Sequence, residues 1–332
     1  MNRRIWKALG IVVCMLALAA PHAMAETIMH TVTADTDFAD VVKNINASGV
    51  DDENVIELCA DITLTGNHTL KRSTTIKSKD EDRKISINGS NAGITVTGEG
   101  TVLNLGANGY DKKLTIEGDG YAEIQAAFVT VSEGATANMY ENVTLQNRKS
   151  TGNAYVLVTG SDRVTGSKSV FNMKGGVIEG GSRAVIAKSG ATFNMSGGEI
   201  RNCRGGSGNG GGVHVYGATF VMSGGTISGC TAVYDGGGLC AENKSTITIN
   251  NGTISGCSAG AGGGLYADNS IVTINKGTIS GCKAVNGYGG GLYAKNSTVT
   301  IEDGTISGCC TTSDIGMGGG LYAYQSTITI SG

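Results

Sequence analysis

Cysteine is the chemically reactive residue with the most regular spacing in this sequence. Five cysteines follow one another at intervals of 27, 27, 25 and 27 residues: Cys203, Cys230, Cys257, Cys282 and Cys309. Cysteines can form disulfides, ligate a metal ion or stay as small apolar thiols. The intervals do not match zinc-finger spacing, which leaves a metal site as the least favoured of the three alternatives.

Residues for acid–base chemistry are sparse. The histidines after residue 25 are His30, His68 and His214. Calcium-dependent cleavage of an acidic polysaccharide requires carboxylates that converge on one wall, together with a base. The aspartates of the repeats, including Asp235 and Asp268, fall at different places in their units. We therefore predict no catalytic residues, no metal site and no cofactor.

The regular cysteines belong to a repeated unit. The heptapeptide GGTISGC at residues 224–230 recurs in nearly the same form from Asn251, Lys276 and Asp303. A glycine triplet follows each copy, as in GGGLYA at residues 262–267, and then an alternating segment such as STITIN at 245–250. Three short strands per 22 to 27 residues, separated by glycine-rich turns, predict an all-β, three-sided parallel solenoid.

Stacking of these units predicts apolar columns inside the solenoid. The first comprises Ile227, Ile254, Ile279 and Ile306, the second Leu239, Leu265, Leu292 and Leu321, and the third Phe220, Ile247, Val272, Val299 and Ile328. Each fully buried large side chain contributes roughly 1.5–3 kcal/mol. One coil cannot bury its apolar side alone, so we expect neighbouring coils to bury it together.

Other columns must point outward. If the leucine of GGGLYA points inward, the next position forms a column that contains His214, Cys240, Tyr266, Tyr293 and Tyr322. A row of aromatic side chains can bind sugar rings or a partner protein, or it can simply stabilise the sheet. We take His214, Tyr266, Tyr293 and Tyr322 as a candidate binding face.

The stacking distance also bears on the cysteines. Adjacent coils lie about 4.8 Å apart, whereas the Cβ atoms of a disulfide approach to about 3.8 Å. In-register cysteines are therefore too far apart for easy bridging. We favour a column of free thiols over disulfide rungs.

The N-terminus has the pattern of a secretory signal peptide at residues 1–25. Arg3, Arg4 and Lys7 precede an apolar run at residues 8–20, and Ala23 and Ala25 provide small residues for cleavage. The run is shorter than the roughly 20 residues that cross a bilayer, so we expect no transmembrane segment. Cleavage would remove three of 25 basic residues and none of the 28 acidic ones, giving a formal charge of −6. This balance argues against nucleic-acid binding.

The remaining chain divides into a cap and a solenoid. We expect residues 26–50 to form an N-terminal cap, because Phe38, Val41, Val42 and Ile45 share one face of a helix that Thr36 or Asp37 can cap. Residues 51–332 then form the solenoid, with regular repeats from about residue 170. STITISG at residues 326–332 breaks off within a coil, so we expect a truncated C-terminus.

These repeats resemble the right-handed parallel β-helix superfamily that includes pectate lyases and many bacterial surface proteins. FNMSGGEIRNC at residues 193–203, followed by GGGV, is similar to bacterial surface repeats and to chlamydial polymorphic outer-membrane repeats, although the FxxN motif of the latter is absent. The pectate-lyase Arg-rich motif contains a proline, and residues 26–332 have none.

The resemblance implies a fold more strongly than a function. We predict a secreted or cell-surface protein that is not an enzyme, an adhesin-like stalk whose partner is a glycan or a host or cell-surface protein. The alternative is a fragment of a lyase or hydrolase that acts on uronic-acid polysaccharides.

Overall fold

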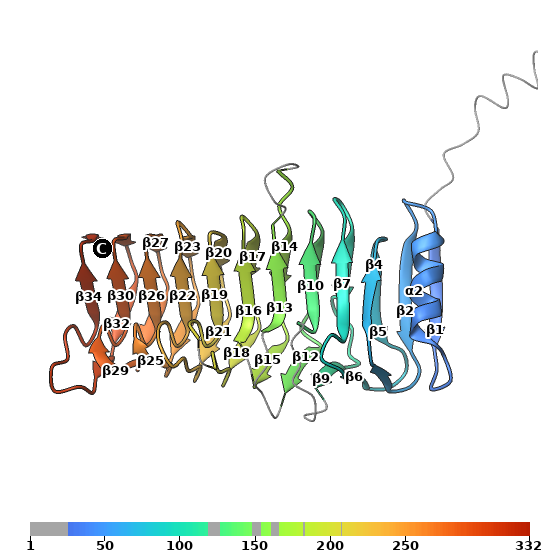
Figure 1. The fold of residues 1–332 in the computed structure, drawn as a ribbon, viewed down its shortest axis with the longest axis horizontal. Helices are drawn as coiled ribbons and strands as arrows, with labels where there is room; N and C mark the ends of the chain where they lie inside the picture. Colours follow the sequence, from blue (N-terminus) through green and yellow to red (C-terminus); the bar gives the residue numbers. More distant parts are fainter. Residues whose placement is uncertain (1–25, 119–126, 148–153, 161–165, 182, 207) are drawn as a thin grey trace, which may run out of the picture.

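The protein is an elongated rod of stacked coils (Figure 1). The computed structural model describes residues 26–118, 127–147, 154–160, 166–181, 183–206 and 208–332. About ten turns carry three long parallel sheets, so the predicted all-β, three-sided parallel β-helix is confirmed. The predicted signal peptide lies outside the described residues.

The sheets have the following strands. Sheet A contains β1 (Thr27–Val32), β2 (Glu53–Leu58), β5 (Thr74–Ser78), β8 (Val102–Leu105), β11 (Thr136–Met139), β14 (Val170–Met173), β17 (Thr192–Met195), β20 (Thr219–Met222), β23 (Thr246–Ile249), β27 (Ile271–Ile274), β31 (Thr298–Ile301) and β35 (Thr327–Ile330). Sheet B contains β3 (Ile62–Leu64), β6 (Arg83–Ile87), β9 (Leu114–Gly118), β12 (Val143–Asn147), β15 (Val177–Gly180), β18 (Glu199–Arg201), β21 (Thr226–Ser228), β24 (Thr253–Ser255), β28 (Thr278–Ser280) and β32 (Thr305–Ser307). Sheet C contains β4 (Asn67–Leu70), β7 (Gly93–Thr97), β10 (Val129–Ser132), β13 (Ala154–Thr159), β16 (Arg183–Lys188), β19 (Val213–Tyr216), β22 (Leu239–Glu242), β26 (Leu265–Asp268), β30 (Leu292–Lys295) and β34 (Leu321–Tyr324). A short sheet D contains β25 (Ser258–Ala261), β29 (Lys283–Tyr288) and β33 (Cys310–Thr311).

Each coil visits sheet A, then sheet B, then sheet C, and pairs with the coils on either side. Ile254 aligns with Ile279, Leu265 with Leu292, and Val272 with Val299. These side chains are at most 1% exposed. The three inward columns expected from the repeats are therefore confirmed, and like side chains stack on like along the axis of the rod.

The helix α2 (Phe38–Ala47) covers the N-terminal end of the rod (Figure 1). The Asp37 side chain accepts a hydrogen bond from the Ala39 amide at 2.8 Å, so Asp37 is the N-cap. The side chain of Asn46 donates to the carbonyl oxygen of Thr69 in β4 and accepts from the amide of Lys71 directly after it, both at 2.8 Å. The helix thus protects an edge that would otherwise expose unpaired backbone groups. No helix within the described ranges is long and apolar enough to cross a membrane.

Each glycine of a triplet is required for a different steric reason, as residues 262–264 illustrate. A Cβ on the first glycine, whose φ is +58°, would lie 2.8 Å from the Cβ of Tyr266. A Cβ on the second would lie 2.6 Å from a carbonyl oxygen of the next coil. A Cβ on the third would lie 2.6 Å from Cγ2 of Ile279 and 3.2 Å from Sγ of Cys282, inside the core. No larger residue fits at any of the three positions without displacing backbone or core atoms.

The regular cysteines form an interior column beside the third glycine of each triplet. Cys203, Cys230, Cys257 and Cys282 are fully buried, and all eight described cysteines are free. The Cys257 thiol lies 3.3 Å from the carbonyl oxygen of Ser255. Hydrogen bonding to the neighbouring thiol, together with burial, raises the pKa of Cys230 and Cys282 well above the ordinary range. These thiols therefore stay protonated and act as small core residues.

Stacked aromatic rings support the middle of sheet A. Phe193 lies with its ring centroid 5.3 Å from that of Phe171 and 5.0 Å from that of Phe220, and all three side chains are fully buried. On the outer side of the same strands, Asn194 donates to Asn172 at 2.9 Å, and the ladder continues to Asn138 and Asn104. Sequence analysis missed this asparagine ladder. In the later coils the same outward column consists of Thr248, Thr273, Thr300 and Thr329.

Replacing Phe193 with alanine should destabilise the protein strongly. Loss of both ring contacts and the resulting cavity should cost about 3–5 kcal/mol, seen as a lower urea midpoint by circular dichroism. The matched control is Ile271→Ala on the same sheet, because Ile271 is 54% exposed. Its cost should stay near 0.5 kcal/mol, and equal shifts for the two variants would contradict the assignment of the core face.

The denatured, unreduced protein should expose all of its cysteines to a thiol reagent. The stacked geometry keeps the thiols of the interior column unbridged, so titration should give eight thiols for residues 26–332. A reduced sample serves as the reference. A count below half of the reference would show that disulfide rungs form.

Candidate functional site

The outer face of sheet C carries the candidate binding residues in one line. His214 aligns with Cys240, Cys240 with Tyr266, Tyr266 with Tyr293, and Tyr293 with Tyr322. The structure therefore brings the four predicted residues, His214 and the three tyrosines, into a single column that runs along the rod. This alignment follows from the in-register stacking of the coils.

The column is less exposed than expected. Tyr266 is only 5% exposed and Cys240 is fully buried, whereas His214, Tyr293 and Tyr322 are partly exposed. The expectation of a continuous exposed row was wrong for the middle of the column. The first glycine of each triplet lies against the Cβ atom of the column residue, so the loop between sheets B and C covers the base of every side chain in the column.

Aromatic side chains gather where the column is open. The ring centroids of Tyr293 and Tyr322 are 5.2 Å apart, and Tyr288 from β29 lies 5.2 Å from Tyr322 and 6.0 Å from Tyr293. Tyr266 meets Tyr293 edge to face at 5.2 Å. These contacts hold the rings in fixed positions at little entropic cost, which suits the recognition of a rigid ligand.

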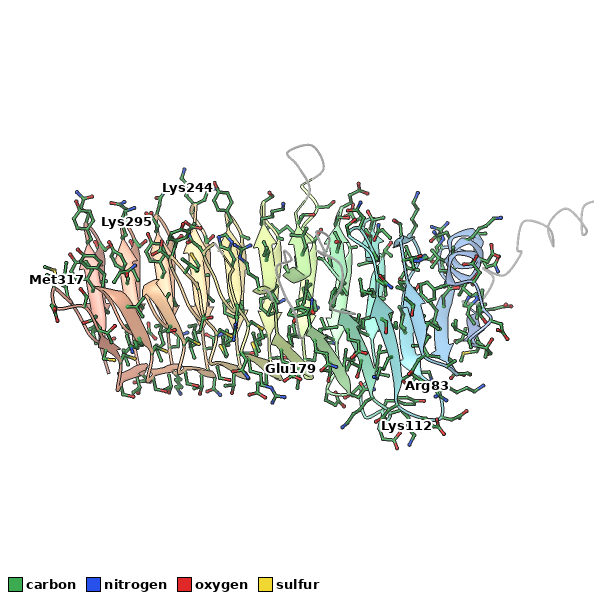
Figure 2. The ribbon with its side chains drawn as sticks, turned by 60° about the horizontal axis from the view of Figure 1, so that its bottom comes forward. Arg83, Lys112, Glu179, Lys244, Lys295 and Met317 are labelled. Carbon is green, nitrogen blue, oxygen red and sulfur yellow. The ribbon has the colours of Figure 1, made fainter. Side chains whose placement is uncertain are left out.

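A second outward column lies two residues further along each strand of sheet C. Tyr216 aligns with Glu242, and Asp268 aligns with Lys295, which aligns in turn with Tyr324. Lys295 projects from the outside of the rod in Figure 2 and forms an ion pair with Asp268 at 2.9 Å. Tyr216 is 48% exposed and Tyr324 is 47% exposed. Between them, Glu242, Asp268 and the turn asparagines 243, 269 and 296 line a shallow open groove.

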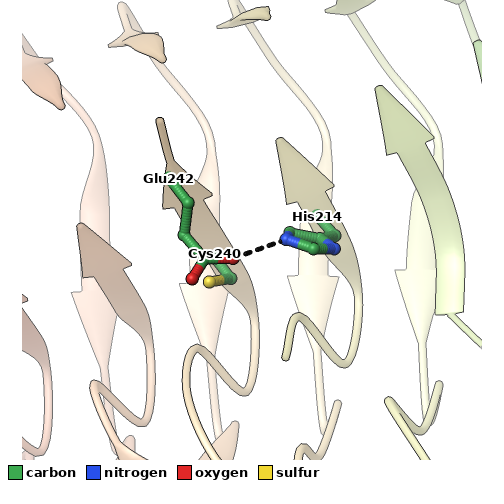
Figure 3. Close-up of side chains that lie close together, drawn as sticks. All are labelled: His214, Cys240 and Glu242. Carbon is green, nitrogen blue, oxygen red and sulfur yellow. Dashed lines mark hydrogen bonds and ion pairs between the residues drawn. The ribbon is translucent and has the colours of Figure 1, made fainter. Parts of the chain in front are cut away.

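A compact polar cluster joins residues of the two neighbouring columns (Figure 3). The Nε2 atom of His214 lies 2.8 Å from Oε2 of Glu242, on the next strand. Ligand atoms of His214, Cys240 and Glu242 all lie within 4.8 Å of one another. Asn209 donates to Oε1 of Glu242 at 3.2 Å and so holds this carboxylate in place.

Electrostatics in this cluster favour a carboxylate on the strand and a protonated thiol. Hydrogen bonding to His214 lowers the pKa of Glu242. Burial, followed by the charges of Glu242 and Asp235, raises the pKa of Cys240 well above its usual range. In the absence of a cation, the Cys240 thiol is therefore a poor nucleophile.

Asp235 approaches the same cluster from the loop between β21 and β22. Burial raises its pKa from 3.8 to about 6, with further contributions from the charges of Glu242 and Asp268 and an opposing one from Lys295. Carboxylates from one loop and two strands thus act on one another. Asp235 and Asp268 come from different places in their repeats, and they interact because the loop before β22 carries Asp235 towards the strands.

A third set of charged residues lines sheet B. Glu117 aligns with Gln146, Gln146 with Glu179, and Glu179 with Arg201. Arg201 pairs with Glu179 at 2.6 Å, and Gln146 donates to Glu117 at 2.8 Å. Gln146 and Glu179 also line a cleft that Arg204 borders. Sequence analysis missed this column because the early repeats are too irregular to align by eye.

Replacing Asp235 with asparagine should remove a pH dependence of stability. The folded protein holds this proton to a higher pH than the unfolded chain does, so stability falls as the pH rises from 3.8 towards about 6. At pH 7 Asp235→Asn should be more stable, on the order of 1 kcal/mol after solvent screening, and the gain should vanish below about pH 4. Urea midpoints measured against pH with a chelator present check this.

The exposed Asp314 supplies the matched control. Asp314→Asn should leave the pH profile unchanged. A stabilisation of Asp235→Asn that is equal at every pH would contradict the assignment.

Comparison with known proteins supports the architecture. Residues 154–332, more than half of the chain, match the family described as the right-handed β-helix region. No curated protein and no solved structure matches the sequence. Because both the family match and the stacked parallel sheets agree on the fold, this chain belongs to the right-handed β-helix family.

Proposed function

We propose that the protein is exported and displayed at the cell surface, where it binds a glycan through the outer face of sheet C without altering it chemically. The observation that carries this proposal is the alignment of tyrosines with a groove of polar side chains along the rod. Tyr216 and Tyr324 offer exposed rings, and Glu242, Asp268 and Lys295 lie between them.

The groove has the chemistry of a saccharide site. Aromatic faces stack on the apolar faces of sugar rings, while carboxylates and amides accept and donate hydrogen bonds to hydroxyl groups. The groove is open and shallow, and it follows the axis of the rod. These features fit an extended chain better than a small enclosed ligand.

The rod itself suits a stalk. Each coil contacts only its neighbours, so a β-helix keeps its shape over any number of coils and offers an extended face. The signal-peptide pattern at residues 1–25 supports export. An adhesin-like role follows from an extended binding face carried on a rigid, exported support.

A second candidate is a lyase or hydrolase acting on uronic-acid polysaccharides. The observation that favours it is the column on sheet B, where Glu117, Gln146, Glu179 and Arg201 are spaced by whole coils beside a cleft. However, the described partners neutralise these carboxylates, because Lys84 lies 3.4 Å from Glu117 and Arg201 lies 2.6 Å from Glu179. Each carboxylate is thus already bound to a cationic side chain of this chain and is not free to contact a substrate or a calcium ion.

Replacing Tyr216 and Tyr324 together with alanine should weaken glycan binding about 30-fold, because two lost stacking contacts of about 1 kcal/mol each sum to about 2 kcal/mol. These two rings are the more exposed ones, so their removal leaves the packed rings of Tyr293 and Tyr322 in place. Binding is measured on a panel of immobilised glycans, acidic and neutral. Tyr140→Ala, which removes a tyrosine that lies over sheet A near Lys174, is the matched control.

Two outcomes would overturn the proposal. Equal binding by the double variant and the control would show that the sheet-C face is not used. Shortening of polygalacturonate by the wild-type protein, lost in Glu179→Gln, would identify the sheet-B column as catalytic instead.

A further inference from the structure

The cluster of His214, Cys240 and Glu242 has the composition of a metal site. It combines an imidazole, a thiol and a carboxylate, the three side-chain types that ligate zinc. Their ligand atoms all lie within 4.8 Å of one another. Sequence analysis predicted no metal site, and it did not consider these three positions together, which are 26 and 2 residues apart and fit no local motif.

We propose that His214, Cys240 and Glu242 bind one Zn²⁺ ion on the outer face of sheet C, with the fourth coordination position left open. Bond lengths of about 2.0–2.3 Å to zinc place tetrahedral ligand atoms roughly 3.5 Å apart. The 2.8 Å between Nε2 of His214 and Oε2 of Glu242 and the outer limit of 4.8 Å for the set lie on either side of this value, so side-chain rotations can bring the three atoms to it.

The backbone pre-arranges these ligands. His214 and Cys240 are directly aligned on the adjacent strands β19 and β22, and Glu242 follows Cys240 on the same outward side. Parallel strands fix such neighbours about 4.8 Å apart. A metal site on rigid strands needs little ordering on binding, which favours affinity.

A second set of contacts orients the carboxylate. Asn209 donates to Oε1 of Glu242 at 3.2 Å, which leaves Oε2 facing His214 at 2.8 Å. Arg183 in turn holds the backbone of Asn209, because its Nε donates to the backbone carbonyl oxygen of Asn209 at 2.8 Å. Such partners of metal ligands typically change affinity 10–100-fold when they are removed.

The surrounding charge favours a cation. Asp235 and Asp268 add negative charge near the cluster, and Lys295 is already paired with Asp268 at 2.9 Å. Arg183 is the opposing positive charge. With Cys240 as a thiolate, the negative charges of Cys240, Glu242 and Asp235 exceed the single positive charge of Arg183 by two. A divalent cation would balance this excess.

The solvent exposure of the cluster allows an ion to enter, and the alternative of a catalytic Cys–His pair fits less well. Cys240 is fully buried, the side chains of His214 and Glu242 are 18% and 25% exposed, and Glu242 lines the open groove. An ion can therefore enter from the carboxylate side. A catalytic Cys–His pair fits less well, because a nucleophile needs access to substrate and Nε2 of His214 already faces Glu242.

The test uses the purified protein loaded with Zn²⁺ or with Co²⁺ as a spectroscopic substitute. We expect one ion per chain, a thiolate-to-cobalt charge-transfer band, and a zinc absorption-edge spectrum with a single sulfur ligand. Cys240→Ser should remove the band, and His214→Gln and Glu242→Gln should each weaken Zn²⁺ binding by more than about 100-fold. Asn209→Ala should weaken it about 10–100-fold.

Cys310→Ser is the matched control, because Cys310 is an exposed thiol elsewhere on the rod. It should bind zinc as the wild type does, and circular dichroism should show that every variant keeps its sheets. No binding, a band that persists in Cys240→Ser, or two or more sulfur ligands would overturn the proposal. The last result would place the ion on the interior cysteine column. None of these outcomes depends on glycan binding, so the two proposals fail separately.

Discussion

In-register hydrogen bonding between parallel coils is the constraint on which the rest of this structure depends. Each strand pairs residue for residue with its equivalents in the coils before and after it, so every position in the repeat becomes a column. Ladder hydrogen bonds leave no freedom to slip by one residue, because a slip would turn the buried isoleucines outward. Differences in coil length are therefore taken up by the loops, above all by those between sheets B and C.

The same constraint explains the unusual glycine content. Where a loop returns to sheet C, its backbone passes directly over one column, beside the next coil, and against the cysteine and isoleucine columns of the core. Each of the three consecutive glycines is needed because a Cβ atom at that position would collide with a different neighbour. The interior cysteines belong to this arrangement, since a thiol fills the space next to the third glycine where a larger side chain would collide with its neighbours.

Folding the loops over sheet C also creates the chemistry of this face. The strands alone would present flat columns of His214, Cys240, Tyr266 and the later tyrosines. The loops cover part of these columns, bring Asp235 and Asn209 onto the face, and leave a groove at its rim. The result is a polar, half-closed region between exposed tyrosines, suited to binding at the surface of a rigid rod. The middle and later coils of sheet A, by contrast, carry outward asparagine and threonine columns.

The sequence by itself determined the solenoid, its inward columns, the alignment of the outward tyrosines and the capping helix. These features depend on local periodicity and on stacking of identical units, both of which can be read directly from a repeat such as GGTISGC. Only the tertiary structure decided which outward residues are covered and which loop residues join them. His214 on β19 lies beside Cys240 on β22, and Glu242 follows two residues later on that same strand, so the three side chains come together. The loop between β21 and β22 brings Asp235 close to them. Such contacts depend on how the backbones of neighbouring coils and their loops are placed in space, and this placement cannot be read from the spacing of residues along the chain.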